Sequence, residues 1–165
     1  MALSLFTQIS YLEMLLVCAI AGFKGGAAER WASLAIFLAW VLQLIVSFAF
    51  FHARSQQFTE LSLLFVDGAL AVALLVLSLI HVKIWLGVAM LLQSLELGLH
   101  GAVMADYGLP YKTYIAFNNL TSFFLLFLLL IATVMERRVR VVKRRSAESA
   151  VSGIDRSKAE LLVAA

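Results

Sequence analysis

The chain contains little charge and almost no proline. Only 14% of its 165 residues are Asp, Glu, Lys or Arg, whereas a soluble domain has about 25%. Hydrophobic residues make up 63% of the sequence, and the mean hydropathy is +0.97. This balance excludes an ordinary soluble domain. Because Pro110 is the single proline, almost nothing in the sequence interrupts helix formation.

Cysteine and N-terminal basic residues are also scarce. The single cysteine, Cys18, cannot form a disulfide within the chain, and its hydrophobic surroundings favour a small packing residue. Residues 1–23 contain no Lys or Arg and carry Glu13, so the basic start of a signal peptide is missing. We therefore expect this segment to be a retained membrane span.

Five hydrophobic segments are long enough to cross a bilayer, which takes about 20 mostly apolar residues. They are Leu3–Phe23, Trp31–Phe51, Leu61–Ile80, Ile84–Ala105 and Tyr114–Met135. The sequence therefore predicts an all-α integral membrane bundle over residues 1–135. We expect a basic juxtamembrane extension over residues 136–145. The tail, residues 146–165, is predicted to be disordered or at best a short helix.

Basic residues are concentrated on one side of the predicted membrane. That side holds Lys24, Arg30, Lys83 and a cluster after the last span, and the other side holds only Arg54 and Lys112. The positive-inside rule then places the N-terminus outside and the C-terminus in the cytoplasm. The cluster is expected to bind anionic lipid headgroups, at about 1 kcal/mol per basic residue. Its members are Arg137, Arg138, Arg140, Lys143, Arg144 and Arg145.

Ionisable side chains inside the predicted spans mark the candidate functional site. A charged group at bilayer depth costs several kcal/mol unless it is paired, solvated or neutralised. When the five spans alternate in direction, nearly all the strongly polar residues fall in the outer half of the membrane. The candidate ligand-binding or proton-binding residues are Glu13, Asp67, Gln93, Glu96, His100 and Asn118.

Two polar stripes are expected to face each other across the bundle. Gln93, Glu96 and His100 follow i, i+3, i+7 spacing and share one face of the fourth span. At i+4 spacing, Glu96 can bond His100 directly. A second stripe on the fifth span follows i, i+4, i+8 spacing from Tyr114 through Asn118 to Ser122. Both stripes should point inward, because polar side chains that face lipid are costly.

Two functions fit this pattern. The first is a non-enzymatic, outward-facing polar pocket that binds or conducts a small ligand, a cation or a proton. The alternative is an accessory subunit of a larger membrane complex, or a homo-oligomer, in which the polar residues bond helices together at roughly 0.6–2 kcal/mol each. Enzyme chemistry is disfavoured, because no Gly-x-Ser-x-Gly motif occurs and no nucleophile adjoins Glu96 and His100. No nucleic-acid partner is expected.

No cofactor is predicted; a divalent metal and haem are the two alternatives that the residues leave open. The Glu96–His100 pair with two further carboxylates offers ligands for a divalent metal, but no His-Glu-x-x-His motif is present. Haem needs a second histidine at the depth of His100. The other histidines, His52 and His81, lie at opposite rims of the predicted bundle.

The layout resembles small inner-membrane proteins of alphaproteobacteria. The resemblance rests on Gly26 to Arg30 after the first span, Val66-Asp67 early in the third, and Gln93 with His100 in the fourth. It covers most of residues 10–140. The resemblance implies a bacterial inner-membrane location and no particular activity.

Overall fold

The computed structural model describes the backbone of residues 5–51, 56–105 and 111–164, and the side chains of residues 11–49, 61–105 and 113–149. Within these residues the chain forms five helices and no strand. In chain order the helices are α1 (Leu5–Lys24), α2 (Ala27–Phe51), α3 (Gln56–His81), α4 (Ile84–Met104) and α5 (Tyr111–Ala164). The predicted all-α class is therefore confirmed.

Four helices are long and apolar enough to cross a membrane. The segments are Ala27–Ala49, Leu61–His81, Ile84–Met104 and Thr113–Ser149, all within the described residues. The chain is therefore a helical membrane protein with four candidate spans. The first predicted span, Leu3–Phe23, corresponds to α1 and is not among these four; the side chains of α1 before Tyr11 lie outside the described residues.

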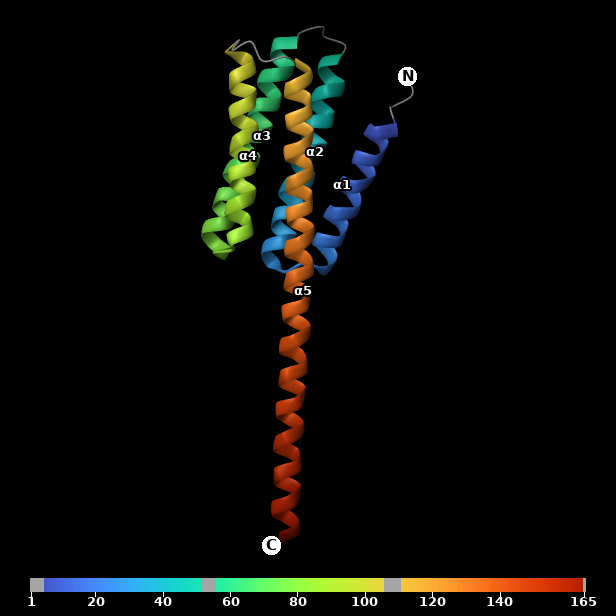
Figure 1. Ribbon diagram of the computed structural model, residues 1–165, viewed down its shortest axis with the longest axis vertical. Helices are drawn as coiled ribbons and strands as arrows, with labels where there is room; N and C mark the ends of the chain where they lie inside the picture. The colour runs from blue at the N-terminus through green and yellow to red at the C-terminus, as the bar shows by residue number, and fades with distance from the viewer. Residues whose placement is uncertain (1–4, 52–55, 106–110, 165) are drawn as a thin grey trace.

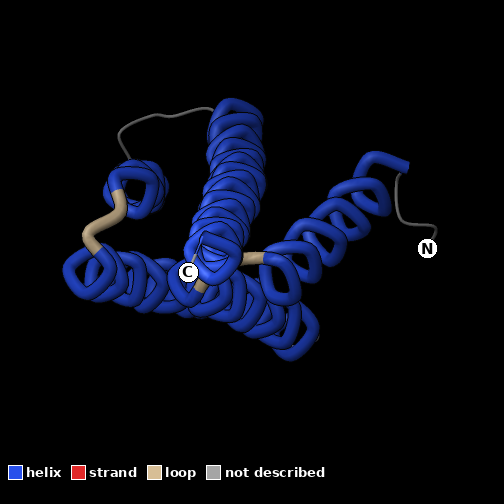
Figure 2. Tube along the Cα trace, turned by 90° about the horizontal axis from the view of Figure 1, so that it is seen from below, coloured by secondary structure: helices blue, strands red, loops and turns tan. Residues whose placement is uncertain are grey.

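The helices form an up-and-down bundle, with α5 packed between its neighbours (Figure 1). We call the end from which α5 extends the tail end. The α1–α2 and α3–α4 turns lie at this end. α1 contacts α2 and α5, and it diverges from them toward its N-terminus, as the view along the bundle in Figure 2 also shows. The divergence leaves the outer part of α1 apart from the other helices.

The two turns at the tail end have different backbone requirements. At Gly25 a β-carbon would collide with the Ala21 carbonyl oxygen and the Glu29 side chain, so the α1–α2 turn needs glycine. Glu29 then accepts a hydrogen bond from the Gly26 N–H over 2.9 Å, which satisfies an unpaired amide at the start of α2. In the α3–α4 turn, Val82 takes φ = 47°, a conformation that is unfavourable for a β-branched residue.

The tail half of the bundle is closed by an apolar core. Leu74, Leu86 and Leu129, from α3, α4 and α5, are fully buried there. Small buried residues lie beside them and allow close helix approach: Ala21, Ala28, Ala32, Ala89 and Ala132. Because dispersion contacts and helix packing replace the hydrophobic effect inside lipid, this close packing is what holds the tail half together.

α5 continues far beyond the bundle (Figure 1). We expected residues 146–165 to be disordered or at best a short helix, but residues 146–164 continue α5 as helix. The physical reason lies in composition and local pairing. Ala, Glu, Lys and Leu are strong helix formers, and Arg144 pairs with Glu148 one turn later, with Nε and Oε1 3.0 Å apart.

Candidate functional site

A cavity of about 440 Å³ lies inside the bundle, between all five helices. Five of the six candidate residues line it: Glu13 from α1, Asp67 from α3, Gln93 and Glu96 from α4, and Asn118 from α5. The remaining walls are mostly apolar and aromatic, with Tyr11, Met14, Trp40, Leu70, Phe123 and Leu126 among them. The structure thus brings together residues that are far apart in the sequence.

Asp67 is the most fully paired carboxyl group of the cavity, and its side chain is only 2% exposed. The Gln43 side-chain amide donates to Oδ1 over 2.7 Å, and Nε2 of His100 lies 2.8 Å from Oδ2. Buried carboxyl groups need such partners, because an isolated one is strongly destabilising in an apolar interior. The three residues come from α2, α3 and α4 and connect these helices by polar contacts.

His100 does not line the cavity but lies behind Asp67. Its Nδ1 is 2.8 Å from the Tyr114 hydroxyl, and the two rings meet edge to face with centroids 5.3 Å apart. The Tyr114 hydroxyl is the hydrogen-bond partner of Nδ1, while Nε2 lies within ion-pair distance of Asp67 Oδ2. α5 is therefore linked through Tyr114 and His100 to Asp67.

Glu96 has weaker partners than Asp67, although the residue is only 4% exposed. The Ser122 hydroxyl donates to its Oε1 over a long 3.4 Å, and Gln93 is a polar neighbour of the same carboxyl group, one turn away on α4. Among the described residues that line the cavity there is no Lys or Arg. Glu96 therefore faces the cavity with little compensation from the protein.

The two predicted stripes do face each other. Tyr114 contacts His100, and Ser122 contacts Glu96, so the polar faces of α4 and α5 meet at two levels. The direct Glu96–His100 bond that the i+4 spacing suggested is replaced by longer-range pairs. His100 turns to Asp67 and Tyr114, and Glu96 turns to Ser122.

Asn118 and Glu13 complete the polar wall. The side-chain oxygen of Asn118 is buried and has no hydrogen-bond partner among the described residues, so it is an acceptor available to whatever enters the cavity. Glu13 is half-buried on α1. The cavity wall also contains Tyr11 and Trp40, whose rings pack edge to face with centroids 5.4 Å apart.

Sequence reasoning left several site residues out of the candidate set. Gln43, Tyr114 and Ser122 are polar residues inside the predicted spans, but the sequence does not indicate that they pair with Asp67, His100 and Glu96. The feature that could have identified them is the one that the six candidate residues share, a polar side chain inside a predicted span. The aromatic residues Tyr11 and Trp40 gave no such signal, since aromatic residues are common on any lipid-facing or core-facing helix.

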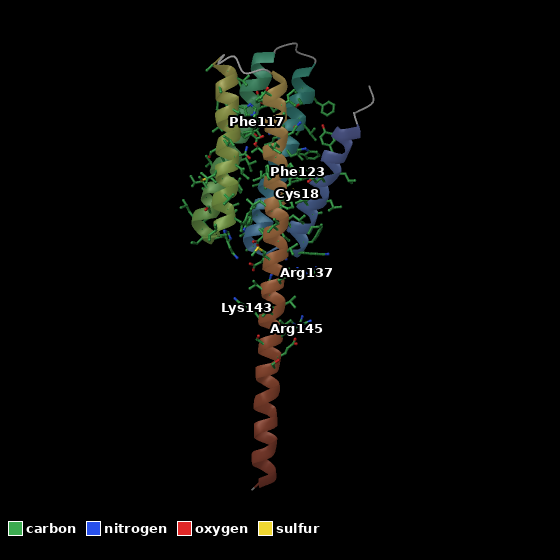
Figure 3. The ribbon with its side chains drawn as sticks, viewed as in Figure 1. Cys18, Phe117, Phe123, Arg137, Lys143 and Arg145 are labelled. Atoms are coloured by element: carbon green, nitrogen blue, oxygen red, sulfur yellow. The ribbon has the colours of Figure 1, made fainter. Side chains whose placement is uncertain are left out.

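The basic residues after the last span lie on the exposed part of α5 below the bundle, where Figure 3 labels Arg137, Lys143 and Arg145. Arg140 donates to the Lys24 carbonyl oxygen over 2.9 Å and so ties α5 to the end of α1. A second cavity of about 310 Å³ lies at this junction. Its charged walls are Lys24, Arg137, Arg140 and Arg144.

An ion pair joins α5 to the α3–α4 turn at the same level. Lys83 Nζ lies 2.8 Å from Glu136 Oε2. This hydrogen bond with Glu136, more than any other contact, raises the pKa of Lys83 above its usual value. The tail end of the bundle is therefore fastened by charge, whereas the cavity lies between neutral and acidic groups.

The described residues contain no group of three or more His, Cys, Asp or Glu side chains placed to hold a metal ion. Compared with protein-family models, with curated proteins and with solved structures, the chain matches none. The class that the fold defines is a helical membrane protein, with a cavity between its described helices. The resemblance to alphaproteobacterial inner-membrane proteins stays a prediction.

Proposed function

We propose that this chain is a non-enzymatic protein of the bacterial inner membrane whose cavity binds a small ligand, a cation or a proton from the outer side. One observation carries the proposal: carboxyl groups from three helices, Glu13, Asp67 and Glu96, line one cavity, and no described Lys or Arg lines it with them. Such a wall attracts positive or hydrogen-bond-donating ligands. Its volume also falls within the usual range for small-molecule sites, about 300–1,000 Å³.

The proposed topology has five spans, with the N-terminus outside. α1 has 20 residues, which gives a helix about 30 Å long, close to the thickness of the hydrocarbon core. Lys24, Lys83 and the cluster on α5 lie toward the tail end, which is then the cytoplasmic side. In this orientation the cavity lies toward the outer side of the membrane.

Binding is favoured over conduction by the packing of the tail half. Leu74, Leu86 and Leu129 are each 0% exposed, and they lie between the cavity and the cytoplasmic end. A conduction path needs polar groups or water along its whole length. Ligand binding from one side needs no such path.

The second candidate is an accessory subunit of a larger membrane complex. The divergence of α1 from α2 and α5 toward its N-terminus favours it, since a helix that leaves its own bundle can pack against a helix of a partner (Figures 1 and 2). In this role the contacts of Asp67 and Glu96 would fix helix positions. A larger protein would then co-purify with the chain in fixed stoichiometry.

Thermal unfolding of the purified protein in lipid nanodiscs tests the proposal. Na⁺, Mg²⁺, benzylammonium and benzyl alcohol serve as probes, and proton binding is followed by potentiometric titration.

At least one probe should raise the unfolding temperature of the native chain, or titration should detect proton uptake. Glu96→Gln should remove that effect, while Glu148→Gln, an acid on the exposed part of α5, should keep it. Identical responses of Glu96→Gln and the native protein would contradict the proposal.

A further inference from the structure

The compensation of charge in the cavity is uneven. Asp67 has Gln43 and His100 as partners, whereas Glu96 has Gln93 and a long hydrogen bond from Ser122. Among the described residues, His100 is the one basic side chain in contact with a carboxyl group of the cavity. Its two ring nitrogens already contact Asp67 and Tyr114. Glu13 is half-buried, so a cation placed in the cavity would find in Glu96 its most deeply buried carboxyl partner that no basic group shares.

A buried hydrogen-bond acceptor without a partner among the described residues lies near the Glu96 contact. The Asn118 oxygen is buried without a partner among the described residues, and Asn118 lies one helical turn from Ser122, which contacts Glu96. A buried acceptor of this kind is costly when left unpaired, at about 1–3 kcal/mol. The matching ligand group is a cation that also carries N–H donors.

The rest of the cavity wall suits an organic body. Tyr11, Trp40 and Phe123 line it, and aliphatic residues close it toward the tail half: Met14, Ile36, Leu70, Leu125 and Leu126. Aromatic walls favour an organic cation through cation–π attraction as well as through apolar contact. A volume of about 440 Å³ holds far more than one water molecule, whose share of liquid volume is about 30 Å³.

We propose that the ligand class of this cavity is a primary organic ammonium: a small molecule with a protonated amine and an apolar or aromatic body. This inference rests on the proposed function, because it names the occupant of the same site. The ammonium group donates to Glu96 and Asn118, and the body lies against the wall formed by Tyr11, Trp40 and Phe123. Bare inorganic cations would leave that apolar wall without a partner.

Three related probes separate the parts of the inference. Benzylammonium carries the charge, the N–H donors and a ring. Benzyltrimethylammonium keeps the charge and the ring without N–H donors, and benzyl alcohol keeps the ring and one donor without charge. Binding is measured by the fluorescence of Trp40 in a Trp31→Phe/Trp85→Phe background, where Trp40 is the sole tryptophan, with the protein in nanodiscs.

Benzylammonium should bind saturably and at least about tenfold more tightly than either relative, as expected for one charge-assisted hydrogen bond. Glu96→Gln should weaken benzylammonium binding by a similar factor, and Glu148→Gln should leave it unchanged. Asn118→Ala should reduce the preference for benzylammonium over benzyltrimethylammonium. If Glu96→Gln fails to fold by circular dichroism, Asn118→Ala and Ser122→Ala carry the test.

The inference and the proposed function fail in different ways. Equal binding of benzyl alcohol and benzylammonium would overturn the ammonium class and leave a binding cavity. Saturable binding of Na⁺ or Mg²⁺, without benzylammonium binding, would also overturn the class while supporting the proposed function. If no probe changes Trp40 fluorescence or the unfolding temperature, and no proton uptake is found, both are overturned.

Discussion

His100 on α4 and Asp67 on α3 form a buried pair, with Nε2 and Oδ2 2.8 Å apart and side chains 7% and 2% exposed. The pair is extended at both ends, by Gln43 on α2 and by Tyr114 on α5. Four helices are therefore held by one chain of polar contacts. Each contact has a low-dielectric surrounding, where a lost partner is costly.

The first prediction concerns the two sides of this pair. His100→Ala leaves the Asp67 carboxyl group buried with Gln43 as its remaining partner, so we expect a loss of unfolding free energy of about 3–5 kcal/mol. Asp67→Asn in the same chain should recover part of that loss, because a neutral amide needs less compensation. Unfolding of the detergent-solubilised protein by SDS, followed by circular dichroism, measures each change.

Ser94→Ala is the matched control for His100→Ala, since Ser94 is exposed on α4 and bonds only to the Met90 carbonyl within the same helix. Its substitution should change the unfolding free energy by less than about 0.5 kcal/mol. Losses from His100→Ala and Asp67→Asn that simply add in the double variant would show that the two side chains are not coupled.

The second prediction concerns pH. Because the hydrogen bond with Glu136 raises the pKa of Lys83, its stabilisation is fully present below the ordinary lysine pKa. It is lost as pH rises through the raised value. The Lys83 side chain is 41% exposed, so the contribution should be less than about 1 kcal/mol. Thermal unfolding from pH 8 upward should show a decline in the native protein that is smaller in Lys83→Met. Parallel curves for the two chains would argue against the ion pair.

The gathering of polar residues in the half of the bundle away from the tail end was predictable from sequence because two rules sufficed. Charge asymmetry sets helix direction, and the high cost of polar groups in lipid turns Glu96, His100 and Asn118 inward. Pairing was not predictable to the same degree. The i+4 spacing favoured a Glu96–His100 bond, but the imidazole lies beside Asp67 instead. The rotation of α3 and α4 about their axes decides which acid faces the imidazole, and the sequence does not give that rotation.

The tail was the other departure. Its low content of large apolar residues indicated disorder, because no core can form there. A helical segment needs no core of its own, however, when it continues a helix that is already formed. α5 is nucleated inside the bundle, so each added residue of the extension costs only propagation and not nucleation. Composition alone carries no information about such a neighbour.

The third prediction concerns the α3–α4 turn. Val82 has φ = 47° and is 85% exposed, so its side chain contributes strain and almost no packing. Val82→Gly should raise the unfolding temperature, with a gain of about 1 kcal/mol from removing the left-handed conformation. Val88→Gly, at an exposed position inside α4, should lower it by a similar amount. A lower unfolding temperature for Val82→Gly would mean that the turn is not strained.

The fourth prediction concerns the basic cavity between α1 and α5. We expect the native protein to gain thermal stability when anionic phosphatidylglycerol replaces part of the phosphatidylcholine in its nanodisc, since basic residues attract anionic headgroups at about 1 kcal/mol each. The triple variant Arg137→Gln/Arg140→Gln/Arg144→Gln removes three side chains that line the cavity. It should lose most of that gain.

A matched variant separates a defined site from general attraction. Arg138→Gln/Lys143→Gln/Arg145→Gln removes the same charge from exposed positions on α5 that do not line the cavity. Comparing each variant between the two lipid compositions cancels any stability lost with the Arg140–Lys24 contact. A larger loss in the first triple variant places the headgroup between α1 and α5. Equal losses indicate diffuse attraction, which salt screens within about 10 Å, and no gain in the native protein excludes headgroup binding.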